Sequence, residues 1–230
     1  MDFSNHKYWP LFTVNGHTAY VTDSILGTWI VMAVLFIVTA IVRIKVKSFK
    51  ETPSGRMQNI IEISVEAMNN MAKSNLGKDL SWLGGYFFGV FVFIIFANYT
   101  ALFHLRPPTA DLATTLAIAI NTFVLVHFLG ITRRKSAYFK DYFTPIFLFA
   151  PMNIVGELAR PVSLSFRLFG NLLGGTIMVH LLYASLPLLL RIGIPNILHI
   201  LEAVVGALQA FIFCILSMTF IKEKASLEEE

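Results

Sequence analysis

Charged side chains are scarce in this sequence. Asp, Glu, Lys and Arg make up 14% of its 230 residues, whereas a soluble domain carries about 25%. Hydrophobic residues make up 56% of the chain. The scarcity of charge excludes an ordinary soluble domain and predicts an integral membrane protein.

Cysteine and catalytic signatures are also lacking. Cys214 is the only cysteine, so the chain forms no internal disulfide. The sequence has no metal-ligand spacing, phosphate-binding loop or nucleophile motif. We therefore expect no metal, no cofactor and no ATP synthesis or hydrolysis by this chain alone. The first residues lack the basic segment and short apolar core of a signal peptide, and no internal repeat suggests an inverted-repeat transporter.

Long uncharged runs, by contrast, are abundant. A helix needs about 20 apolar residues to cross a hydrocarbon core of about 30 Å. Four runs meet this requirement and predict spans over residues 24–46, 80–105, 112–132 and 196–221. They predict a single all-α, polytopic membrane domain over residues 1–230. The basic residues lie at the predicted membrane edges, so the positive net charge does not indicate nucleic-acid binding.

A fifth hydrophobic region, residues 142–190, allows two interpretations. Its 49 residues carry three formal charges, Glu157, Arg160 and Arg167, so it either crosses twice without a polar turn or forms one long tilted helix. Basic residues gather after the first span and before this region, and the positive-inside rule makes both loops cytoplasmic. One crossing is then favoured. It gives five spans, residues 1–23 outside and the tail 222–230 in the cytoplasm.

Residues 56–77 are too polar to span a membrane. One helical face carries apolar residues, namely Ile60, Ile61, Val65, Met68 and Ala72. The other face carries polar residues, namely Glu62, Glu66, Asn69 and Lys73. This pattern predicts an amphipathic helix on the cytoplasmic surface or against a partner.

A polar stripe crosses the fifth region. On a regular helix its members lie within about 40° of one line; they are Arg160, Ser163, Arg167, Asn171 and Gly174. A charge at the centre of a spanning helix costs about 2.5–3.5 kcal/mol on insertion scales, so Arg167 indicates an ion pathway with a charged partner. Gly170 and Gly174 predict the close approach of another helix on nearly the same side. Thr176 points to the opposite side, and His180 lies closer to that side.

The last span has a stripe of its own. His199, Glu202, Gly206 and Gln209 lie near one face. A carboxylate, an imidazole and an amide on one face can hold water or relay protons.

Simpler structural roles remain open for several of these residues. Arg160 can pair with Glu157 or reach lipid headgroups. Glu202 can be an acid at the membrane interface. Gln209 can join helices by an ordinary hydrogen bond.

The motifs RPVSLSFRLFGN, from Arg160, and LQAFIF, from Leu208, resemble those of subunit a of F-type ATP synthases. The resemblance covers nearly the whole chain. It implies a stator subunit whose last two helices are long, tilted and placed against a ring of proteolipid c-type subunits. Further implied partners are peripheral-stalk b-type subunits, the rest of the synthase and membrane lipids, in a bacterial plasma membrane.

The resemblance also implies roles for particular residues. Arg167 would face the ring carboxylates and separate two aqueous half-channels for H⁺ or Na⁺, with Asn171 and Gln209 beside it. Glu202 would line the outer half-channel.

Two positions depart from the family pattern. Thr176 stands where relatives often have Glu or His, and His180, one turn later, is the candidate substitute. Asn153 stands where many relatives have a carboxylate, and Glu157, one turn on, is the candidate for the inner half-channel.

Two rival interpretations remain. The chain can be a stand-alone ion channel or anion carrier that uses Arg167 as the substrate's counter-charge, or a passive membrane scaffold.

Overall fold

The computed structural model describes residues 7–14, 17–49, 55–103, 106–143, 147–187, 190 and 193–226. Within this part of the chain, five helical segments are long and apolar enough to cross a membrane. They are α1 (Asp23–Val46), the segment Lys78–Phe103 around α3 (Gly84–Tyr99), α4 (Leu112–Arg134), α6 (Ala150–Ser185) and α8 (Ile194–Ala225). The expected five-span, all-α architecture is confirmed.

Local sequence explains where several helices begin. The side chain of Asp111 accepts a hydrogen bond from the backbone N–H of Ala113 and so caps α4. Proline lies at the first turn of both α6 and α8, where its missing N–H costs nothing. The short 3-10 turn Pro108–Ala110 leads into α4, and α5 (Ser136–Asp141) and the turn Phe147–Phe149 lead into α6.

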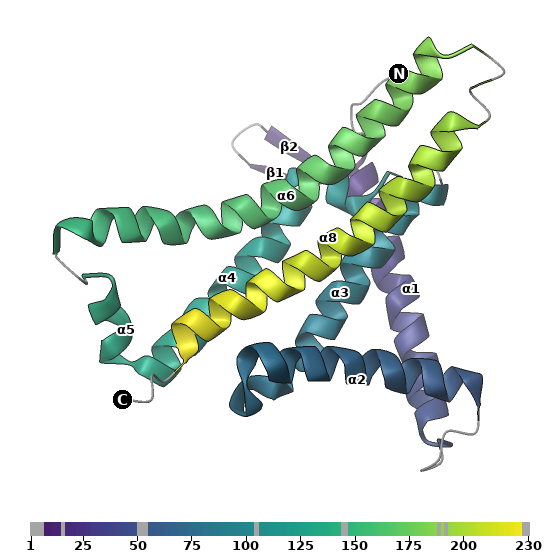
Figure 1. Ribbon diagram of the computed structural model, residues 1–230. Coiled ribbons are helices and arrows are strands. Elements are labelled where there is room, and N and C mark those ends of the chain that lie inside the picture. The colour runs from purple at the N-terminus through teal and green to yellow at the C-terminus, as the bar shows by residue number, and fades with distance from the viewer. Residues whose placement is uncertain are drawn as a thin grey trace.

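The long hydrophobic region contains one continuous helix, so it crosses once. α6 begins at Ala150, eight residues after the predicted start, because Tyr142 and Phe143 form a turn after α5. Its 36 residues span about 54 Å, which requires a strong tilt within a hydrocarbon core of about 30 Å. α6 and α8 run obliquely to α1 and α3, and α6 bends along its length (Figure 1).

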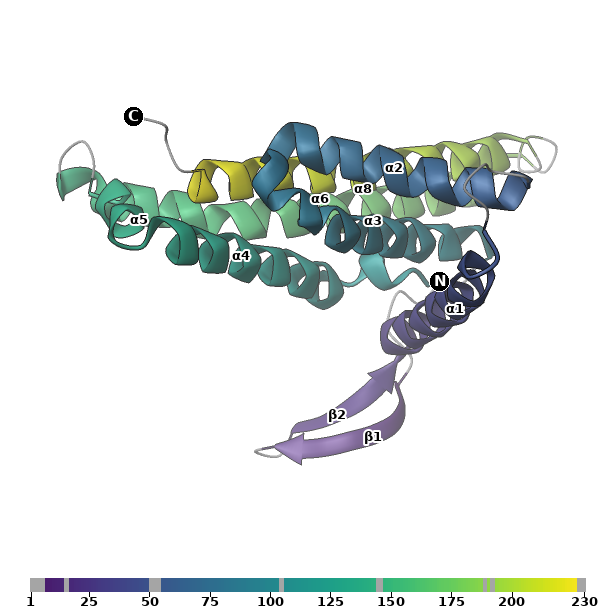
Figure 2. The same ribbon diagram turned by 90° about the horizontal axis from the view of Figure 1, so that it is seen from below.

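The helices form two packed layers. α6 and α8 lie together, and α3 and α4 cover one side of them (Figure 2). A buried cluster from α3, α4, α6 and α8 joins the layers at mid-height; it comprises Ile94, Ala119, Leu164, Leu168, Ala210 and Phe213. α1 packs through Ser24, Gly27 and Val31 against α3 and the Pro108–Ala110 turn, and most of its other large apolar side chains are exposed, Phe36 at 75%, as expected where a helix faces lipid.

The predicted surface helix is α2 (Arg56–Leu76), which lies across one end of the bundle (Figure 1). Met68, Ala72 and Leu76 pack into a cluster with α3, α4 and α8. Ile60 and Val65, on the predicted apolar face, are exposed. The buried apolar residues of α2 all come from its C-terminal half, and Gln58 in its first turn is buried as well.

A β-hairpin before α1 did not follow from the helical analysis. β1 (Lys7–Val14) and β2 (His17–Thr22) pair antiparallel. The hydroxyl of Tyr8 donates a 2.8 Å hydrogen bond to Asp23 in the first turn of α1. The hairpin projects away from the layer of α6 and α8 (Figure 2).

Candidate functional site: the polar seam between α6 and α8

Arg167 lies on an exposed face of α6. Ser163, Gly170 and Gly174 on the same face are exposed too, and Asn171 is half-buried. Within the described residues, no carboxylate lies within salt-bridge distance of Arg167. A permanently charged guanidinium therefore sits in a spanning helix without an acidic partner among the residues that the structure describes.

The glycines of this face do not contact another helix of the chain. A Cβ added at Gly170 or Gly174 would meet no atom of the described chain within 4 Å. The close approach occurs at Gly175 instead, where a Cβ would come within 2.6 Å of Glu202 Oε1. The two glycines thus leave the Arg167 face open, and their neighbour Gly175 makes room for the acid on α8.

The side of α6 opposite Arg167 meets the acid of α8. The hydroxyl of Thr176 donates to Glu202 Oε1 at 3.4 Å, and His199 Nδ1 lies 3.7 Å from Glu202 Oε2. His180 Nδ1 lies 2.7 Å from the carbonyl oxygen of Thr176. We call Thr176, His180, His199 and Glu202 the outer polar cluster; it joins a carboxylate and two imidazoles across the seam.

Gln209, which lies two helical turns after Glu202, is buried. Its Nε2 atom has no hydrogen-bond partner among the described residues. Between Gln209 and Glu202, α8 is held by α3, because Asn98 Nδ2 donates to the carbonyl of Gly206 at 3.1 Å. Asn98 Oδ1 in turn accepts from the hydroxyl of Thr109 at 2.6 Å.

A group of four charges lies near the other end of the seam. We call it the inner charge cluster; its members are Glu157 and Arg160 of α6 and Glu223 and Lys224 of α8. Arg160 Nη2 lies 2.7 Å from Glu223 Oε1, and Arg160 Nη1 lies 3.6 Å from Glu157 Oε2. Lys224 forms an ion pair with the other oxygen of Glu157, whose side chain is only 7% exposed.

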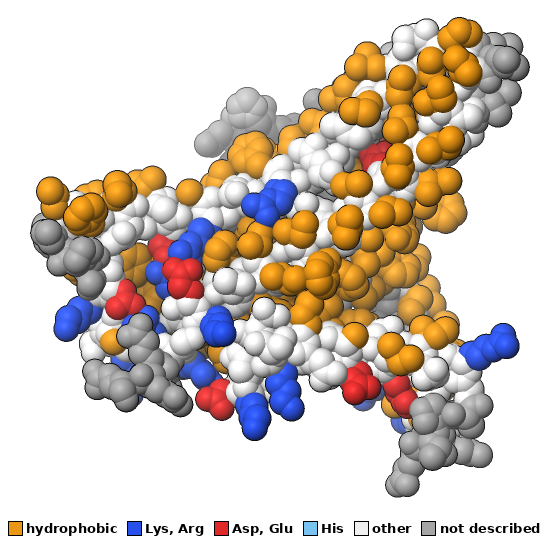
Figure 3. Space-filling view, in the orientation of Figure 1, with side chains coloured by type: hydrophobic (Ala, Val, Ile, Leu, Met, Phe, Trp, Pro, Cys, Tyr) orange, Lys and Arg blue, Asp and Glu red, His pale blue; other side chains and the backbone are white. Residues whose placement is uncertain are grey.

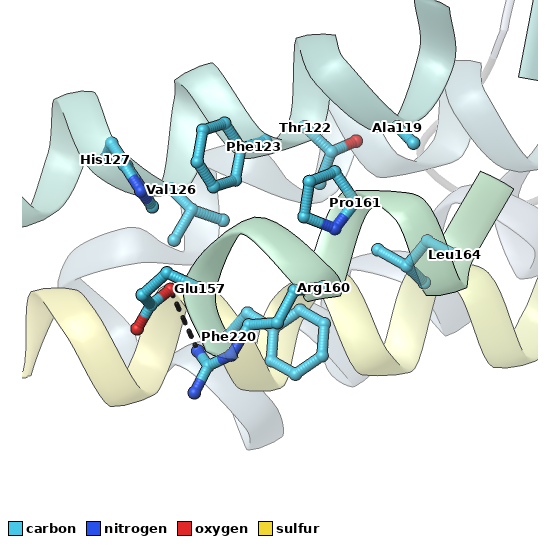
Figure 4. A pocket seen from close by; sticks show the side chains of 10 residues that line it. All are labelled: Ala119, Thr122, Phe123, Val126, His127, Glu157, Arg160, Pro161, Leu164 and Phe220. Carbon is cyan, nitrogen blue, oxygen red and sulfur yellow. Dashed lines mark ion pairs between the residues drawn. The ribbon is translucent and has the colours of Figure 1, made fainter. Parts of the chain in front are cut away.

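Aromatic side chains surround this cluster. The guanidinium of Arg160 lies 4.8 Å from the ring centre of Phe220, and Figure 4 shows Arg160 beside that ring with its ion pair to Glu157. The ammonium of Lys224 lies 4.9 Å from the ring centre of Tyr142. Burial, and then the hydrogen bond with Tyr138, raise the pKa of Tyr142, so its hydroxyl stays protonated at neutral pH.

Two cavities meet at the inner charge cluster. An open polar pocket of about 570 Å³ is lined by the whole cluster, by the Arg134–Asp141 ion pair and by Asn153. Asn153 also donates a 3.0 Å hydrogen bond to the carbonyl of Tyr142. A groove of about 200 Å³ continues from Gly156 and Arg160, past Ser163, to Arg167.

The predicted site residues thus lie in three places. Glu157 and Arg160 belong to the inner charge cluster, and Arg167 and Asn171 lie on the open face. The remaining four lie along the packed seam, namely Thr176, His180, Glu202 and Gln209. Sequence analysis missed Glu223 and Lys224, which we assigned to a cytoplasmic tail. α8 continues through these charged residues to Ala225. The continuation of the helix beyond the apolar residues was the signal that could have identified them. The described residues contain no group of three or more His, Cys, Asp or Glu suited to a metal ion.

Comparisons with known proteins agree on one family. A family model described as ATP synthase A chain matches residues 25–222. ATP synthase subunit a of Geobacter sulfurreducens is 33% identical over 212 residues, which are 90% of this chain and 88% of that protein. The protein of the same name from Geotalea daltonii is 32% identical over 238 residues, covering 100% of this chain and 96% of that protein. The chloroplastic ATP synthase subunit a of Stigeoclonium helveticum is 30% identical over 234 residues, which are 95% of this chain and 89% of that protein.

Proposed function

The chain belongs to the ATP synthase A chain family, and from this premise we propose that it is the stator ion-channel subunit of a rotary F-type ATP synthase. In this role it carries ions to and from a ring of proteolipid c-type subunits. It is a non-catalytic part of the complex, because the nucleotide chemistry belongs to other subunits. Its partners are the ring, peripheral-stalk b-type subunits, the remaining synthase and membrane lipids.

The observation that carries the proposal is the exposed, acid-free environment of Arg167. A charged side chain in a spanning helix needs an opposite charge or water. Since the described chain offers Arg167 no carboxylate, the partner is a carboxylate of the ring. The open surface at Gly170 and Gly174 gives a ring helix room to approach.

A fixed cation suits this task for a physical reason. Arg stays protonated when it is buried, whereas Lys changes its protonation more readily. A nearby positive charge favours the ionised form of a carboxylate, so each passing ring site releases its ion beside Arg167. The same charge repels a cation that would move directly between the two sides of the membrane.

Two separate access routes follow from the polar groups on either side of Arg167. We assign the outer polar cluster, with Glu202 at its centre, to the outer half-channel. We assign the polar pocket beside Glu157, Arg160 and Asn153 to the inner half-channel. Asn171 and Gln209 lie between these two groups on α6 and α8.

The proposed location is the plasma membrane of a bacterium, with the N-terminus outside and the C-terminus in the cytoplasm. Basic side chains gather around α2 and the C-terminal end of α8, whereas hydrophobic side chains dominate the opposite ends of α6 and α8 (Figure 3). The positive-inside rule then makes the basic end cytoplasmic.

Replacement of Arg167 by Ala tests the proposal. We expect Arg167→Ala to abolish ion-coupled ATP synthesis while the complex still assembles, because the ring carboxylates lose the cation that favours their ionised form. Arg167→Lys should largely fail as well, since Lys differs in shape and in how firmly it keeps its proton. The measurements are ATP synthesis in membrane vesicles and subunit composition of the purified complex.

The same preparation separates the rival functions. A stand-alone channel or anion carrier would transport ions as a purified chain without the ring. A passive scaffold would lose assembly, not coupling, when Arg167 is replaced. Normal coupled synthesis by Arg167→Ala would exclude the proposed role.

A further inference from the structure

The groove that leads to Arg167 begins at another arginine. Gly156 and Arg160 line both the polar pocket and the groove, and Arg160 is the only charged side chain that the two linings share among the described residues. If the pocket is the inner half-channel, an ion moving from it toward Arg167 passes the guanidinium of Arg160. We call this junction the neck.

A bare guanidinium at the neck would oppose a passing cation. A unit charge has a strong effect on another charge a few ångströms away, and salt screens that effect where water enters. Arg160 is not bare, however, because Glu223 lies 2.7 Å from it in a charge-assisted contact and Glu157 lies 3.6 Å away.

Among the described residues, the charges around the pocket balance. Lys224 pairs with Glu157, and Arg134 pairs with Asp141 on the rim. The described lining carries three basic and three acidic side chains, and each is in an ion pair. The balance depends on Glu223, whose side chain is half-exposed and is supplied by the last turn of α8.

We propose that Glu223 is a rate-determining residue of ion entry, because it neutralises Arg160 at the neck of the inner half-channel. It acts on the passing ion through charge and does not bind the ion. The inference rests on the proposed function and extends it to a residue near the end of the chain.

Two variants test this role, one that removes a negative charge from the cluster and one that removes a positive charge. Glu223→Gln leaves the inner charge cluster with one excess positive charge, and we expect ion flux to slow on the order of tenfold. Lys224→Gln removes a positive charge from the same cluster, so its effect on flux should differ from the slowing in Glu223→Gln, and high salt should not reverse it. The double variant Arg160→Gln/Glu223→Gln restores neutrality and should return flux close to that of the wild type.

Ionic strength provides a second readout that a purely structural role would not change. The slow flux of Glu223→Gln should recover at high salt, because the screening length falls from about 10 Å at 0.1 M to about 3 Å at 1 M. The matched control is Lys222→Gln, an exposed charge next to Glu223 that lies outside the pocket lining, and it should behave like the wild type.

The experiment uses the complete synthase in vesicles and measures ATP-driven ion pumping and passive ion flux. Equal losses in Glu223→Gln and Lys224→Gln, with no rescue by the double variant, would show a structural clamp and overturn the inference. Unchanged flux in Glu223→Gln would overturn it as well. Arg167→Ala serves as the reference: if wild-type flux does not require Arg167, the proposed function itself fails.

Discussion

At the scale of single residues, Glu202 has two neighbours that differ in their acid–base chemistry. Thr176 contributes a hydroxyl, which can only donate or accept a hydrogen bond, whereas His199 contributes an imidazole. In the proposed outer half-channel, proton exchange would depend on the carboxylate and the imidazoles, while Thr176 orients one carboxylate oxygen.

Glu202→Gln separates these roles, because Gln keeps the shape of the side chain and cannot titrate. We expect ion flux to fall by up to about a hundredfold, the lower end of the contribution of a positioned acid–base group. The curve of ion flux against external pH should change its shape. The loss should be smaller than that of Arg167→Ala.

The measurement is ion flux in vesicles across a range of external pH. Glu66→Gln, at an exposed acid on α2, is the control for loss of one carboxylate. A Glu202→Gln curve that overlays the wild-type curve would identify Glu202 as an ordinary interfacial acid.

At the scale of helices, the contact of α3 with α8 fixes the height at which Glu202 and Gln209 face α6. Thr109, Asn98 and the carbonyl of Gly206 form a buried hydrogen-bonded chain. Hydrogen bonds between membrane helices contribute about 0.6 kcal/mol on average, so close packing provides most of the stability. A Cβ at Gly206 would approach Asn98 Nδ2 to 2.9 Å.

Gly206→Ala should therefore destabilise the packed helices by about 1–3 kcal/mol, the usual cost of overpacking. The matched control is Gly89→Ala on α3, where a Cβ would meet no described atom within 4 Å. Thermal unfolding of the purified complex compares the two variants. Equal stability of both would show that α3 and α8 separate without penalty at this point.

The helices themselves were predictable because their signals are local. Hydropathy gave four spans, the distribution of basic residues favoured a single fifth crossing, and the 3.6-residue period placed Ser163, Arg167 and Asn171 on one face. Contacts between distant residues were not predictable in this way. The pair Arg160–Glu223 joins residues 63 positions apart, and nothing within either helix specifies the other.

Two further differences between the predictions from the sequence and the structure have physical reasons. Small residues permit a close helix contact without specifying the partner, so the pattern at Gly170 and Gly174 did not reveal that the contact lies at Gly175. The hairpin was overlooked because a search for helical periods passes over alternating strands, although the sequence Asn15-Gly16 is a recognised hairpin signal.

At the scale of the whole molecule, α3 and α4 cover one side of the α6–α8 layer (Figure 2). Arg167 and its neighbours on the same face of α6 are exposed. In the assembled synthase we expect the ring to cover that face. A cysteine at Ser163, in a chain with Cys214 replaced, should crosslink to the ring helix that carries the carboxylate. A cysteine at Thr176 should crosslink within the chain, since Thr176 lies against Glu202.

Gel analysis of the crosslinked products distinguishes the two cases by mass. The reverse result, with position 176 joined to the ring and position 163 joined within the chain, would contradict the orientation and the role of Arg167 with it.

The absent side chains at Gly170 and Gly174 also have a mechanical consequence. Side chains on a helix normally form ridges that interlock with the grooves of a neighbour, and interlocked helices resist sliding. Beside Arg167 the ridge is interrupted at both glycines, so the surface is comparatively smooth where successive ring helices would pass. In the proposed stator, such a surface would hold each carboxylate by electrostatic attraction with little steric interlocking, which would lower the friction of rotation.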